Sequence, residues 1–303
     1  MRAININPEK KDKVVKRLKL YSKVRGPIKR RGFETSKVNA NGVPLEITKP
    51  VGSTSKKLVF IVHGGVFVMP LMDMYRKLAL DCYKELDDVV VINIDYRVAP
   101  EHVYPAAHDD VLTAWNYITG DMGFKPKNIV IFADSAGGNL SLSLTAKLRD
   151  AGLEKPAALA LMSPWIDLSA SGASYKGNYD KDILFGRRKT KLDENELRTQ
   201  LLKCGVFAYV AGHDNKDPHL SPVFAEYHNF VPTLICVGGH EMLLDDSLTL
   251  FKKLSDAGGE VETIIGKGMF HCYPLASDFS PTAKIDFHKI LHFINKHLQK
   301  GSN

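Results

Sequence analysis

The sequence is poor in cysteine, and it lacks both a long apolar run and a leader-like start. Its four cysteines, in 303 residues, have no metal-type spacing, so we expect reduced thiols, no metal site and a cytoplasmic location. They are Cys82, Cys204, Cys236 and Cys272. No apolar stretch reaches the roughly 18–20 residues that span a bilayer. The first residues have no apolar core before a small-residue cleavage site, and we therefore expect no secretory signal.

The sequence has more basic than acidic residues, 41 Lys and Arg against 34 Asp and Glu. The formal net charge of +7 raises nucleic acid as a partner, but zinc-finger spacing and RNA-binding signatures are missing, so we expect none. Residues 10–31 hold eleven Lys and Arg against one acid, Asp12. Val14, Leu18 and Tyr21 recur there at helical spacing, which predicts an amphipathic helix with a basic face. A solvated helix face is the simpler interpretation, and contact with a membrane surface or an anionic ligand is the alternative.

From about residue 45 onward, strand-like runs alternate with helix-like ones. The predicted strands are Leu58–Val62, Val89–Ile94, Ile129–Ala133, Ala158–Met162, Thr233–Val237 and Val261–Ile265, with weaker edge strands around Gly32–Val38 and Leu45–Thr48. The predicted helices are Tyr75–Glu85, His108–Thr119, Gly138–Asp150 and Asp246–Ala257. Several strands are apolar throughout, as in parallel sheets that are covered on both faces. The pattern predicts an α/β fold with a mostly parallel, doubly wound sheet.

Two segments interrupt this alternation. Residues 1 to about 40 are basic and predicted helical, and residues from about 168 to 225 are polar without a strong strand. An insertion of that length after a core strand indicates a functional cover. The predicted organisation is therefore an N-terminal cap segment at 1–44, a core at 45–167, a cap insertion at 168–225 and the rest of the core at 226–303.

A serine lies between a predicted strand and a predicted helix, in the run Ala133-Asp134-Ser135-Ala136-Gly137. The nucleophile-elbow pattern is G-x-S-x-G, and alanine stands here in place of its first glycine. A strand-to-helix turn this sharp needs tiny flanking residues and holds the serine under strain. The following helix would direct its N-terminus at a developing oxyanion. An ordinary tight turn is the alternative for this motif taken alone.

Glycines also follow an earlier strand, in His63-Gly64-Gly65. Adjacent glycines there allow backbone N–H groups to point into a cavity and hold an oxyanion, although a plain glycine-rich turn fits too. We interpret His63 as an orienting residue rather than a base. His271 follows the last predicted strand, where it could act as a base or be structural. Glu241 is the first carboxylate after the strand before it.

Six blocks together resemble the hormone-sensitive-lipase, or HGGG, family of α/β-hydrolase esterases. They are HGG at 63–65, DYRVAPE at 95–101, DSAGGN at 134–139, SPWIDL at 163–168, GGHEMLLDDS at 238–247 and GMFH at 268–271. The match covers about residues 45–168 and 220–300. The two interruptions correspond to where this family carries a helical cap over its active site.

The resemblance implies a Ser135-His271-Glu241 triad in the chain order serine, acid, histidine. Asp245 and Asp167 are the alternatives for the acid. It also implies an oxyanion hole, a scaffold around that loop and no cofactor. The implied oxyanion donors are the backbone N–H groups of Gly64, Gly65, Val66 and Ala136, and the implied braces are Asp95, Tyr96, Arg97, Glu101, Asp134 and Asn139.

Valine at position 66 departs from the family's third glycine, and a β-branched residue resists positive φ. We expect Val66, Phe67 and Trp165 to narrow the acyl pocket, which predicts a carboxylesterase for small, short-chain esters. The alternatives are a non-catalytic small-molecule receptor on the same fold, an interfacial lipase, and an amidase or peptidase. Oligomeric state is left open, a homodimer included.

Overall fold

The computed structural model describes residues 26, 28–186 and 208–301. The predicted basic helix around Val14–Tyr21 lies outside the described residues. Within them, one eight-stranded sheet has the order β1-β2-β4-β3-β5-β6-β7-β8. The strands are β1 Phe33–Ala40, β2 Val43–Pro50, β3 Leu58–Val62, β4 Val90–Ile94, β5 Ile129–Asp134, β6 Ala158–Met162, β7 Thr233–Gly238 and β8 Val261–Gly266. β2 pairs antiparallel with β1 and β4, and the remaining neighbours are parallel.

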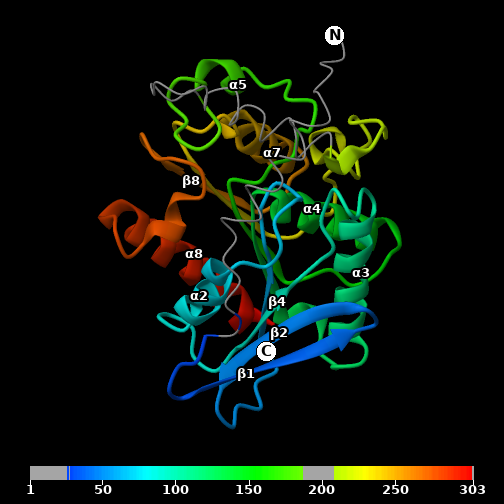
Figure 1. The fold of residues 1–303 in the computed structure, drawn as a ribbon, viewed down its shortest axis with the longest axis vertical. Coiled ribbons are helices and arrows are strands. Elements are labelled where there is room, and N and C mark those ends of the chain that lie inside the picture. Colours follow the sequence, from blue (N-terminus) through cyan, green and yellow to red (C-terminus); the bar gives the residue numbers. More distant parts are fainter. Residues whose placement is uncertain (1–25, 27, 187–207, 302–303) are drawn as a thin grey trace.

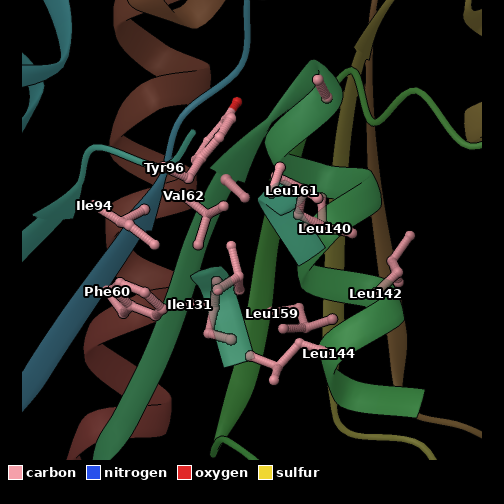
Figure 2. Close-up of a cluster of buried hydrophobic side chains, with 14 of the residues drawn as sticks. Phe60, Val62, Ile94, Tyr96, Ile131, Leu140, Leu142, Leu144, Leu159 and Leu161 are labelled. Carbon is pink, nitrogen blue, oxygen red and sulfur yellow. The ribbon is translucent and has the colours of Figure 1, made fainter. Parts of the chain in front are cut away.

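Helices cover both faces of this sheet, with α2 and α8 on one side and α3 and α4 on the other (Figure 1). The α-helices whose bounds are described are α2 Asp73–Cys82, α3 Ala106–Thr119, α4 Ser135–Asp150, α5 Ser174–Gly177, α7 Leu244–Asp256 and α8 Pro281–Lys300. Alternation along each strand explains the two layers, because successive side chains point to opposite faces. In β3, Phe60 and Val62 pack toward Leu140 and Leu144 of α4 (Figure 2), while Val59 joins the cluster under α2 and α8.

The predicted fold class is confirmed, and its six main strands lie within one residue of their expected ends. The helix ends differ by up to three residues, and two differences bear on the site and the domain division. The sheet begins at Phe33, so the expected division between residues 44 and 45 falls inside β2. Helix α4 begins at Ser135 rather than Gly138, because β5 passes into it without a loop. Of the described helices, none combines the length and apolarity that a membrane span requires.

Candidate active site

Ser135 lies at the junction where β5 ends at Asp134 and α4 begins. Its φ of 49° is in the left-handed region, which costs a non-glycine residue about 1–3 kcal/mol. The turn is tight enough that a Cβ at Gly137 would overlap the carbonyl oxygen of Val62. The expected strain is therefore present, and it holds the serine at the carboxyl edge of the sheet. Ala136 follows in the first turn of α4, where N–H groups have no acceptor within the helix.

The loop after β3 contains three successive positive φ angles, 114° at Gly65, 59° at Val66 and 59° at Phe67. Val66 therefore adopts the conformation that its branched side chain resists. No described residue accepts a hydrogen bond from the N–H of Gly65 or Val66. The Gly64 N–H, by contrast, donates to Asp134 Oδ1 at 2.8 Å. The Gly64 N–H is therefore removed from the predicted set of oxyanion donors, because it already has a partner. Gly65, Val66 and Ala136 remain as candidates.

Tyr96 and His63 support this loop from its buried side. The Tyr96 hydroxyl donates to the His63 carbonyl at 2.7 Å, and the two rings stack at 4.2 Å. His63 Nδ1 lies 2.6 Å from the Gly64 carbonyl oxygen. Burial lowers the pKa of His63 to about 4, so its ring is neutral at pH 7. An orienting role fits this arrangement, because the ring packs inside the loop and is fully buried.

The structure brings His271 and Glu241 into direct contact. His271 Nδ1 lies 2.7 Å from Glu241 Oε2, and the glutamate is fully buried. The other carboxylate oxygen accepts hydrogen bonds from the Ser163 hydroxyl at 2.6 Å and from the Gly238 N–H. Ser163 Oγ also accepts the N–H of Cys272 at 3.0 Å. Ser163 thus joins the acid to the backbone beside the histidine, and motif reading had given this residue no role.

The electrostatic environment of His271 favours its protonated form. Burial lowers its pKa, but the Glu241 charge and hydrogen bond, followed by the charges of Asp182 and Asp134, outweigh burial and leave the pKa raised. Three carboxylates, those of Glu241, Asp182 and Asp134, therefore favour an imidazolium at this position. Such a site stabilises the positive charge that a histidine base acquires when it removes a proton.

The alternative acids are hydrogen-bonded elsewhere. Asp245 Oδ2 accepts the Ser174 N–H at 2.8 Å. Asp246 Oδ2 accepts two backbone N–H groups at 2.9 Å, and Asp167 accepts those of Ser169 and Ser171. Among the described carboxylates, Glu241 is the one hydrogen-bonded to His271. The geometry therefore favours it over Asp245 and Asp167.

A cavity of about 500 Å³ contains both Ser135 and His271. The rest of its lining is mostly apolar: Gly65, Val66, Met69, Met72, Met74, Tyr75, Asp134, Leu184, Phe185, Phe270, Cys272, Leu275, Ala276 and Phe279. Phe67 and Trp165 are not part of this wall, contrary to expectation. Phe67 is fully buried and stacks on Tyr209 at 4.2 Å, and Trp165 is 1% exposed. The Phe67 ring therefore lies in the core instead of the pocket, in a loop where its own φ is positive.

Sequence reasoning also missed the methionines of this wall. Met69, Met72 and Met74 lie between β3 and the first turn of α2, where a run of three methionines in six residues was the available signal. Unbranched, polarisable side chains of this kind adapt to differently shaped apolar groups. No group of three or more His, Cys, Asp or Glu in the described ranges could hold a metal ion.

Known proteins are similar to this chain in sequence and in structure. A family model described as alpha/beta hydrolase fold matches residues 59–275. An esterase of Acinetobacter venetianus is 32% identical over 77% of this chain and 72% of its own length. An acetyl-hydrolase of Streptomyces hygroscopicus is 31% identical over 75% of this chain and 71% of its own.

Solved structures extend the likeness to nearly the whole chain. An esterase of the bacterial hormone-sensitive lipase family superposes with a TM-score of 0.79 at 25% identity, covering 97% of this chain and 99% of that one. A hormone-sensitive lipase from a metagenome library gives a TM-score of 0.80 at 28% identity, with 98% and 94% covered. The chain therefore belongs to the α/β-hydrolase fold and, within it, to the hormone-sensitive-lipase family of carboxylic ester hydrolases.

Proposed function

We propose that the chain is a serine carboxylesterase that hydrolyses short-chain, uncharged acyl esters through an acyl-enzyme on Ser135. The observation that carries this proposal is the buried contact of 2.7 Å between His271 Nδ1 and Glu241 Oε2, because His271 lines the same cavity as the strained Ser135. A pair of this kind needs a nucleophile within reach of the second imidazole nitrogen to perform acyl transfer.

In the proposed mechanism, Ser135 Oγ attacks the ester carbonyl while His271 Nε2 takes its proton. The carbonyl oxygen becomes an oxyanion, held by backbone N–H groups of Gly65, Val66 and Ala136. When this intermediate collapses, the imidazolium gives its proton to the departing alcohol. Water then attacks the acyl-enzyme by the same route, and Ser135 regains its proton as the carboxylic acid leaves. Glu241 holds the histidine tautomer throughout.

The preference for short acyl groups is supported by cavity size and by the relatives. A space of about 500 Å³ must hold both the acyl and the alcohol portions of the ester. Among the described residues of the lining, Asp134 and His271 carry the only carboxyl group and the only imidazole, and the rest is apolar or neutral, which supports an uncharged substrate. Proteins 31% and 27% identical to this chain are named acetyl-hydrolases, the second as a putative one.

The test is hydrolysis of p-nitrophenyl esters from acetate to decanoate by the wild type and by Ser135→Ala. We expect the wild-type rate to peak at short chains and to collapse in the variant. Equal activity in both proteins would mean that another residue is the nucleophile. Faster cleavage of decanoate than of butyrate would overturn the short-chain assignment, and a rate increase above the solubility limit would favour the interfacial lipase alternative.

A further inference from the structure

The predicted cap insertion reaches the acid loop through the turn that follows α5. Asp182, in this turn, is 1% exposed. Its Oδ1 accepts the N–H groups of Leu184 at 2.8 Å and Phe185 at 2.9 Å, and its Oδ2 accepts the N–H of Met242 at 2.8 Å. One buried carboxylate therefore ties its own turn to the residue that follows Glu241.

Two further contacts connect the same turn to the proposed catalytic pair. Asn178 Nδ2 donates to the carbonyl oxygen of Glu241 at 2.8 Å. The Phe185 ring lies edge-on against the His271 ring, with centroids 4.8 Å apart and planes at 66°. The turn thus holds the backbone of the acid on one side and limits movement of the imidazole on the other. A residue that fixes this turn acts on the orientation of both partners.

We propose that Asp182 is a positioning residue for catalysis, which fixes the Glu241 loop and the Phe185 ring against His271 and places a second negative charge beside the imidazole. This inference rests on the proposed function, in which His271 is the base. Asp182 is not part of the cavity wall, so it acts through other residues and not on the substrate.

The pKa of His271 is the measurable quantity that distinguishes this role from a purely structural one. Within the described part of the chain, the ionisable side chains that act on His271 or share its cavity are Glu241, Asp182, Asp134, Cys272 and Tyr75. Burial raises the pKa of both Cys272 and Tyr75, so these two are neutral near pH 7. The pKa of His271 is lowered by burial and raised, in decreasing order, by Glu241, Asp182 and Asp134, with a net increase. Removing the Asp182 charge should therefore lower it.

The experiment measures the pH profile of kcat/KM for p-nitrophenyl butyrate with the wild type and Asp182→Asn. We expect the acid limb to move to lower pH by roughly 0.5–1 unit, less than the roughly 1–3 units that a charge in direct contact can give. We expect kcat on the plateau to fall roughly 3- to 10-fold, with KM within about twofold of wild type. Asp167→Asn is the matched control, because Asp167 is also buried and also accepts two backbone N–H groups of its own turn.

A lower plateau with an unmoved acid limb in Asp182→Asn would refute the proposal, because loss of a purely structural contact leaves the His271 charge environment intact. So would an equal movement of the limb in Asp167→Asn. If Asp182→Asn does not fold, Asp182→Glu replaces it. That variant keeps the negative charge but displaces the carboxylate. We therefore expect the acid limb of the pH profile to stay in place and kcat to fall at least about threefold. A kcat equal to that of the wild type would refute the proposal. Retained activity in Ser135→Ala would instead refute the proposed function itself.

Discussion

Ser163→Ala removes a hydroxyl that links three parts of the site. Its Oγ donates to Glu241 Oε1 at 2.6 Å and accepts the Cys272 N–H at 3.0 Å, and the side chain is fully buried. A hydrogen bond to a buried charged group contributes about 1.5–3 kcal/mol, and an unpaired buried N–H costs about 1–3 kcal/mol. The two effects overlap, so we expect a loss of about 2–4 kcal/mol in the free energy of unfolding.

Activity should fall as well, because Glu241 keeps its contacts with His271 and Gly238 but loses one of the groups that fix it. A displacement of about 1 Å at such a position can cost up to ~10²-fold in rate. Urea unfolding gives the stability, and hydrolysis of p-nitrophenyl butyrate gives kcat. Ser143→Ala is the matched control, since Ser143 is equally buried and its hydroxyl has no hydrogen-bond partner among the described residues. The reasoning fails if both variants unfold at the same urea concentration and Ser163→Ala keeps kcat within twofold of wild type.

Two further substitutions test the oxyanion loop. Tyr75→Phe removes the hydroxyl that donates to Asp134 Oδ2 at 3.0 Å. Burial raises the pKa of Asp134, against hydrogen bonds that lower it, so we expect a loss of about 1–3 kcal/mol at pH 7.5 that shrinks as the pH falls through the folded-state pKa. Urea unfolding from pH 7.5 down to the lowest pH at which both proteins still fold tests this, and a loss that stays constant over the whole range contradicts it. Val66→Gly relieves about 1–3 kcal/mol of backbone strain. It also removes a similar amount of stabilisation, because the buried valine side chain is lost. The free energy of unfolding should therefore stay nearly constant. The ratio of kcat/KM for the hexanoate ester to kcat/KM for the acetate ester should rise, and an unchanged ratio would show that Val66 does not limit the size of the acyl group.

Much of this architecture is encoded locally, and sequence patterns therefore predict it. The apolar runs of β3 and β5 identify buried parallel strands, and the small residues around Ser135 are required by the turn itself. Helix α8 was missed although its signals were present. Ser280 accepts a hydrogen bond as its N-cap, and Pro281 occupies its first turn. Reading the C-terminal segment for caps as well as periodicity would have predicted it.

Other parts of the site depend on contacts that no local pattern records. Ser163 meets Glu241 across 78 residues of sequence, and Asp182 meets Met242 across 60. Phe67 follows the glycine pair closely, a position that predicts a pocket residue, but its ring is buried in the core against Tyr209. The Gly64 N–H fits the oxyanion motif in sequence, but in the fold it donates to Asp134, 70 residues away. In each case the partner is selected by tertiary packing.

The contact between Asp182 and the acid loop has a consequence for exchanging parts between related enzymes. A chimera that replaces residues 168–225 would be intended to alter substrate choice alone. It would also remove Asn178, Asp182 and Phe185, and with them the packing and charge around His271. A chimera of this kind should therefore show the pH optimum of the enzyme that supplies the cap, as well as its substrate selectivity, unless these three side chains are retained.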